Sequence, residues 1–333
     1  MTFFQDLRRR GARVLAPALA ATALLAACGG GTQQVQSFVP SRLLVLGDET
    51  SVIVDNGSGD GFKYSLNDRV TTTTNGKGKC LLLPTFSQQI AAHYGFVFSA
   101  CNPEGKTEFK AVVHARIDAK VDDATTGLKA QLDGITGLGA TDLVMVMIGA
   151  NDVIDLYEQR SAGTQTTDAL AIAEAKRRGG VAAAQINRVL GSGARALVLT
   201  IPEMGKSPYA VSRGANAVAL LSALTTAYNA ALRLGIDSTD FDGRNYGLVL
   251  ADDVVSVMVK FPASYLTSPA NVTASVCDSA GMPQGCLIVT GATAPAVNIA
   301  SNTNLWASDR HLGPVAHAQI GAQALSRAIH NPF

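Results

Sequence analysis

The sequence has 333 residues, of which 47% are hydrophobic, and its 27 basic residues nearly balance 26 acidic ones. This length allows a large buried core, and the near-neutral charge gives no electrostatic basis for binding nucleic acid. The five histidines are scattered without an HExxH motif, and the cysteines form no CxxC motif. We therefore predict neither a metal site nor a cofactor.

The N-terminal residues have the pattern of an export signal. Four arginines between residues 8 and 13 precede an apolar stretch over residues 14–27, which ends in Leu-Ala-Ala directly before Cys28. We therefore predict a signal peptide over residues 1–27. The cleavage site resembles the lipobox of bacterial lipoproteins, which implies that Cys28 is lipidated and anchors the protein to a membrane through a flexible tether, residues 28–40. Gly29 after this cysteine implies the outer membrane of the cell envelope.

Apolar runs and helical patterns alternate along residues 41–333, which we predict to be a single domain. Fully apolar strands that alternate with helices are typical of a parallel sheet covered on both faces, so the predicted fold is doubly wound α/β. Residues 55–79 between the first strand and the first helix are polar and predict a surface loop. The predicted strands are residues 43–46, 96–100, 143–148, 196–201 and 248–251, and the predicted helices are residues 84–94, 125–132, 168–190, 215–234 and 315–329.

The four cysteines after Cys28 predict disulfides, because an exported chain with an even number of cysteines favours them. The sequence allows three pairings. Proximity favours Cys80–Cys101 and Cys277–Cys286, each expected to stabilise the fold by about 2–4 kcal/mol.

Three polar clusters mark a candidate site. Ligands of such sheets bind at the carboxyl ends of the strands, and two of the clusters directly follow predicted strands. The third lies near the end of the chain. They are residues 47–49, 149–152 and 309–311.

These clusters carry a family resemblance. The segments LGDETS, MIGANDV and WASDRHLGPVAHAQIG resemble, in order and spacing, the blocks of the SGNH/GDSL hydrolases, especially their esterase and lipase branch. The resemblance covers nearly the whole exported chain and implies a flavodoxin-like sheet and a carboxylester substrate with an acyl group. It also implies that His311 is the catalytic base, and that Asn151, with Gly149 beside it, belongs to the oxyanion-binding block.

The sequence departs from the family pattern at three places. Glu49 stands where the nucleophilic serine is expected, and its carboxylate would place negative charge where an oxyanion must develop. The orienting acid usually lies three residues before the histidine, where this chain has Ser308, and the nearest acid is Asp309. The glycine of the second block aligns with residues 112–116, which puts His114 or Val113 at an oxyanion-binding position.

Other polar and aromatic residues have simpler interpretations. We expect Thr50 or Ser51 to cap a helix, and Asp152 likewise. His317 and Trp306 are expected to be packing residues.

Three functional hypotheses follow. The first is a degenerate hydrolase that has lost serine chemistry and uses its pocket to bind an acyl, ester, glycan or lipid-like ligand, or a partner. The second is an active ester hydrolase in which Glu49 and His311 activate water. The third is a structural or assembly lipoprotein of the envelope that uses its surface.

Overall fold

The computed structural model describes residues 38–68, 79–164, 167–288 and 302–330. From Phe38 onward they belong to one compact unit. The predicted signal peptide, Cys28 and the tether up to residue 37 lie outside the described residues.

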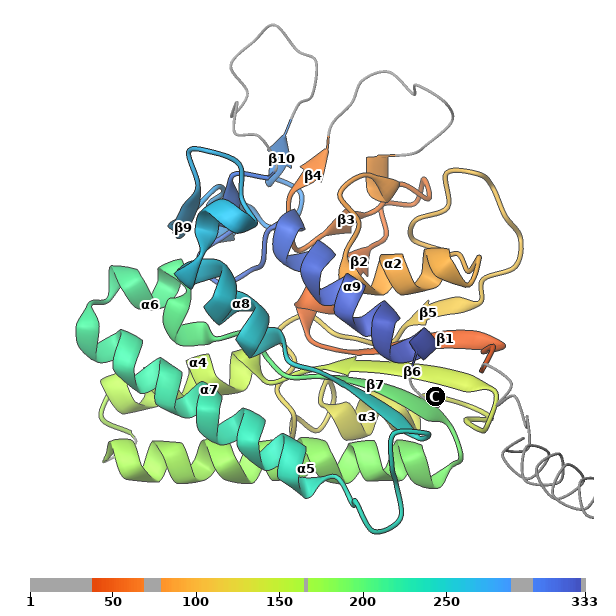
Figure 1. The fold of residues 1–333 in the computed structure, drawn as a ribbon, viewed down its shortest axis with the longest axis horizontal. Helices are drawn as coiled ribbons and strands as arrows, with labels where there is room; N and C mark the ends of the chain where they lie inside the picture. Colours follow the sequence, from red (N-terminus) through yellow and green to blue (C-terminus); the bar gives the residue numbers. More distant parts are fainter. Residues whose placement is uncertain (1–37, 69–78, 165–166, 289–301, 331–333) are drawn as a thin grey trace, which may run out of the picture. The chain divides into compact units, whose positions relative to one another are not determined.

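The core of this unit is a five-stranded parallel sheet in the order β5-β1-β6-β7-β8 (Figure 1). Counted along the chain within this sheet, the order is 2-1-3-4-5, which is the flavodoxin-like arrangement. The prediction of a doubly wound, flavodoxin-like fold is therefore confirmed. The strands are β1 (Arg42–Gly47), β5 (Ala111–Val113), β6 (Asp142–Met147), β7 (Arg195–Leu199) and β8 (Tyr246–Val249).

The apolar runs form central strands because their alternate side chains fill two separate cores. In β1, Leu44 and Leu46 point into one core, while Leu43 and Val45 point into the other. A strand that is buried on both faces is apolar nearly throughout, and β1, β6 and β7 contain no charged residue after their first position.

Helices cover both faces of the sheet (Figure 1). One face packs against α3 (Leu128–Asp133), α4 (Ala150–Ser161), α5 (Asp168–Gly191) and α7 (Ala215–Gly235). The other face packs against α2 (Phe86–His93), α8 (Ala251–Lys260) and α9 (Pro314–His330).

Short elements surround this core. Single helical turns are the 3-10 segments η1 (Glu49–Ser51), η3 (Lys79–Leu81), η4 (Met204–Lys206), η5 (Pro262–Ser264) and η6 (Ser279–Gly281), and the short helix α6 (Pro208–Ser212). Three two-stranded ladders pair β2 (Ile53–Val54) with β3 (Phe62–Lys63), β4 (Asn67–Asp68) with β10 (Leu287–Ile288), and β9 (Asn271–Ser275) with β11 (Asn304–Trp306).

Most predicted elements are present with shifted ends, but one strand was wrong. Residues 96–100 make only isolated bridges, and the edge strand of the sheet is β5 instead, which pairs with β1. The prediction also missed α4 and α8. Helix α4 begins within the polar cluster at residues 149–152, and α8 begins at Ala251, the last residue of a predicted strand.

Both predicted disulfides are present, Cys80–Cys101 and Cys277–Cys286. Helix α7 is long and apolar enough to cross a membrane by length and composition alone. It packs on the sheet with Leu221, Leu224 and Tyr228 fully buried. A core helix of a globular domain can be as long and as apolar as a membrane-spanning helix, and α7 is packed as a core helix.

Candidate functional site

The carboxyl end of β1 positions Glu49. Gly47 has a φ of +141°, and a Cβ there would lie 1.9 Å from the carbonyl oxygen of Met147, so the turn requires glycine. The Asp48 side chain then caps η1, with its Oδ1 accepting from the Thr50 N–H at 3.1 Å. The expectation that Thr50 or Ser51 is the cap was wrong, since both lie inside this turn.

The side chain of Glu49 is held by two donors from different segments. Its Oε2 accepts from Asn151 Nδ2 at 2.8 Å and from the backbone N–H of Asp118 at 3.0 Å. Asp118 has a φ of +56°, a left-handed conformation that non-glycine residues seldom adopt. With this backbone conformation, the Asp118 N–H faces the same oxygen as the Asn151 amide.

His311 lies on the other oxygen of this carboxylate. Its Nε2 is 3.4 Å from Glu49 Oε1, and its Nδ1 is 2.6 Å from Ser308 Oγ. The Ser308 hydroxyl also accepts from the backbone N–H groups of Arg310 and His311, which leaves its proton to point at Nδ1. This favours the neutral tautomer with its proton on Nε2, directed at Glu49.

The structure therefore separates the two candidates for the orienting position. Ser308 contacts the imidazole, whereas Asp309 accepts from Ser279 Oγ and pairs with Arg310. Asp309 does not reach His311, because a shift of one residue in this turn points its side chain toward Ser279.

His114 also lies away from the carboxylate. It directly follows β5, and its backbone N–H donates to the Val45 carbonyl at 2.7 Å. The prediction placed a donor within residues 112–116, whereas the backbone donor that meets Glu49 comes four residues after His114, at Asp118. No residue type marks Asp118 in the sequence, since its contribution is a backbone group.

Gly149 supports the site without touching Glu49. It begins α4 with a φ of +126°, and a Cβ there would lie 2.3 Å from the Tyr228 ring. The Tyr228 hydroxyl donates to the Ile148 carbonyl at 2.9 Å. Gly149 thus lets α4 start close to the core, which places Asn151 in the first turn of the helix.

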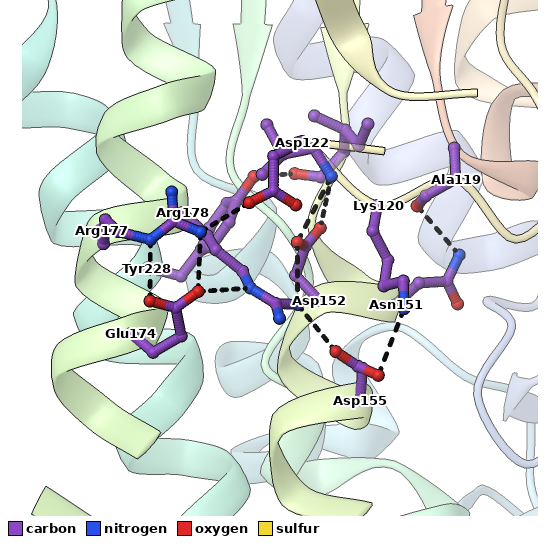
Figure 2. Close-up of polar contacts among 12 residues, drawn as sticks. Ala119, Lys120, Asp122, Asn151, Asp152, Asp155, Glu174, Arg177, Arg178 and Tyr228 are labelled. Atoms are coloured by element: carbon purple, nitrogen blue, oxygen red, sulfur yellow. Dashed lines mark hydrogen bonds and ion pairs between the residues drawn. The ribbon is translucent and has the colours of Figure 1, made fainter. Parts of the chain in front are cut away.

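Charged residues hold the loop between β5 and α3, which contains Asp118, against α4 and α5 (Figure 2). Asp152, fully buried in the first turn of α4, accepts from the Val121 N–H at 3.0 Å and pairs with Arg178 at 3.3 Å. Lys120 pairs with Asp155 at 3.2 Å. Asp152 is therefore an anchor inside the helix, and the expectation of a helix cap was wrong.

Burial and charge set the protonation of the two adjacent acids. Burial raises the pKa of Glu49, but hydrogen bonds from His311 and Asn151 outweigh it and bring the pKa below its usual value. Burial and the neighbouring Glu49 charge raise the pKa of Asp48 to about 8. Glu49 is therefore ionised and Asp48 protonated at neutral pH.

This arrangement sets what the site can do chemically. Glu49 and His311 are only 5% and 6% exposed, and Tyr64 lies beside them with its ring centroid 5.2 Å from that of His311. The two donors that could hold a developing oxyanion are already bonded to a carboxylate oxygen. Within the described ranges, no group of three or more His, Cys, Asp or Glu side chains could hold a metal ion.

Comparisons with known proteins add little to this site. No protein-family model matches the chain, and no curated protein matches it. Among solved structures, the chain is similar to LAE5, described as an alpha/beta hydrolase enzyme from the metagenome of Lake Arreo, Spain. The identity is 16%, the TM-score is 0.44, and the match covers 87% of this chain and 95% of LAE5. A likeness this distant bears on neither mechanism nor substrate.

Proposed function

We propose that this protein is a non-hydrolytic relative of the SGNH/GDSL hydrolases that binds an acyl or lipid-like ligand at the cell envelope. In this proposal a lipidated Cys28 anchors it to the outer membrane. The motifs around Gly47, Asn151 and His311 support the family assignment, and the residue at position 49 supports the loss of serine chemistry.

One observation carries the proposal: the Glu49 carboxylate occupies both anion donors, Asn151 Nδ2 and the Asp118 N–H. Ester hydrolysis through a serine needs a hydroxyl at this position and free donors for the oxyanion. Glu49 has no hydroxyl, and its negatively charged carboxylate is bonded to both donors. The remaining base, His311, is bonded to the same carboxylate and has no proton to take from a nucleophile.

The test is turnover of short-chain nitrophenyl esters by the wild type, Glu49→Ser and Glu49→Ser/His311→Ala. We expect no turnover above background for the wild type. Glu49→Ser frees both donors and supplies the hydroxyl, so it should gain activity. A base typically contributes a factor of about 100 to 10,000, so the double variant should lose most of that gain.

Asn151→Ala in the Glu49→Ser background is the matched test of the donor. Loss of a single oxyanion donor typically lowers kcat by a factor of about 100 to 1,000. If Glu49→Ser folds and stays inactive, the donors and the histidine are not arranged for acyl transfer, and the proposed relationship is wrong.

The contact between Glu49 and His311 favours a second candidate, an ester hydrolase in which this pair activates water. It predicts turnover by the wild type that is lost in both Glu49→Gln and His311→Ala. A lowered pKa makes Glu49 a weak base at neutral pH, so we rank this candidate below the first.

A further inference from the structure

A groove lies beside the last turns of α4, whereas Asn151, which contacts Glu49, lies in the first turn of that helix. It has a volume of about 550 Å³ and runs between α4, α5 and the start of α7. This volume is in the range of small-molecule sites, about 300–1,000 Å³. Neither Glu49 nor His311 lines it. The residues that matter for the argument are Arg160, Asp168, Ile172, Arg213, Ala219 and Leu220.

One end of the groove carries a net positive charge. Arg160 is neutralised by Asp168 at 2.6 Å. Arg213 is exposed, and within the part of the chain that the structure describes it is paired with no carboxylate. Its guanidinium is nevertheless held in place, with its carbon 3.5 Å from the centroid of the Tyr209 ring and a hydrogen bond to the Tyr209 carbonyl at 3.1 Å.

The other residues that line the groove carry no charge, and those of α7 after Asn216 are aliphatic; Tyr157 and Ser161 of α4 line it as well. Helix α7 contains no charged residue from Ala215 to Leu232, and it presents Ala219 and Leu220 to the groove opposite Ile172 of α5. A fixed cation beside the start of α7 and aliphatic side chains along the next turns of that helix are complementary to a molecule with an anionic head and an apolar chain.

We propose that this groove binds a long-chain aliphatic carboxylate, with the head group on Arg213 and the chain along Ala219, Leu220 and Ile172. A planar guanidinium bonds a carboxylate through two parallel N–H groups. The inference does not depend on the function proposed for Glu49, because the two sites share no residue.

The probe is decanoate below its critical micelle concentration, titrated calorimetrically into the full chain carrying Cys28→Ser. We expect saturable binding. Arg213→Gln should weaken it at least about tenfold, because a hydrogen-bonded charge pair is lost. Arg233→Gln, at the other end of α7, is the matched control and should bind as the wild type does.

A second pair of variants tests whether the chain of the ligand lies along α7, by placing opposite charges at the exposed position 219. Ala219→Glu places a like charge beside the chain and should weaken decanoate at least about tenfold, whereas Ala219→Lys should not weaken it. Butyrate, which has the head without the chain, and decyltrimethylammonium, which has the opposite charge, should each bind at least about tenfold more weakly than decanoate.

The proposal is overturned if decanoate does not saturate, if Arg213→Gln binds it as the wild type does, or if Ala219→Lys weakens it as much as Ala219→Glu. Failure here is separate from failure of the proposed function. The groove is tested by decanoate affinity, and the Glu49 site by ester turnover of Glu49→Ser.

Discussion

Two neighbouring acids at the end of β1 differ in charge because their hydrogen bonds differ. Glu49 receives donors from Asn151, Asp118 and His311, which stabilise its ionised form. Asp48 is 1% exposed, and among the residues that the structure describes it receives only the Thr50 N–H on Oδ1, while its Oδ2 has no partner there. A buried carboxyl with so few donors keeps its proton. Of the two acids at this strand end, Glu49 therefore carries the negative charge and Asp48 is neutral.

This difference predicts how stability depends on pH. The folded pKa of Asp48 is raised to about 8, while an unfolded aspartate titrates near 3.9. Between those values the folded protein holds a proton that the unfolded chain has lost, so the contribution of Asp48 to stability falls as pH rises. Asp48→Asn removes this term. We expect its stability relative to wild type to increase by about 2 kcal/mol or more from pH 5 to pH 8.

Urea unfolding at the two pH values measures this change. Asp240→Asn, at an exposed position, is the control and should show the same difference from wild type at both. A parallel pH dependence in Asp48→Asn and wild type would mean that Asp48 is ionised in the fold.

At the scale of elements, the candidate site depends on how the loop of Asp118 is fastened to α4 and α5. Arg178 of α5 reaches Asp152, Asp155 and Glu174 at distances of 2.9–3.3 Å. Its side chain is 11% exposed, whereas the neighbouring Arg177, which pairs with Asp122 and Glu174, is 49% exposed. The two arginines therefore form ion pairs in very different environments.

Replacing each arginine by methionine separates these environments. Arg178→Met leaves the buried Asp152 carboxylate without its counter-charge and should destabilise the fold by about 3–5 kcal/mol. Arg177→Met removes an exposed pair and should cost about 1 kcal/mol or less. Denaturant unfolding of the two variants measures both changes in the free energy of unfolding. Equal changes would show that the buried ion pair contributes no more to stability than the exposed one.

At the scale of the whole molecule, each disulfide joins two segments outside the central sheet. Cys80–Cys101 spans 21 residues in sequence and Cys277–Cys286 spans 9. The first bond joins η3 to the segment between α2 and β5, and the Cys80 carbonyl also accepts from Lys63 and from Gln88 in the first turn of α2. The second fixes the segment that precedes the turn of His311.

The loop lengths predict the cost of removing each bond. Replacing Cys80 and Cys101 by alanine should lower the free energy of unfolding by about 3 kcal/mol, because the unfolded chain gains freedom. The same change at Cys277 and Cys286 should cost about 0.7 kcal/mol less, because its loop is shorter. Chemical unfolding of the two double variants measures this, and a larger loss for the shorter loop would contradict the entropic explanation.

Local chemistry in the sequence was enough to predict the fold and the neighbourhood of the site. The unbroken apolar runs of β1, β6 and β7 determine strands buried on both faces, and the carboxyl ends of such strands meet at one edge. Cysteine proximity gave the correct pairs. Each of these signals acts over a few residues, or follows from a rule of sheet topology, so tertiary structure is not needed to find it.

The tertiary structure alone decided which groups meet at that edge. Three contacts join segments whose relative placement depends on loop conformation. They are the Asp118 N–H with Glu49, Ser308 rather than Asp309 with His311, and Asp152 with Arg178. A backbone donor is the same in every residue, and a turn shifted by one position exchanges one side chain for another. Such contacts form only when the packed helices and sheet have fixed the loops, so no local pattern in the sequence records them.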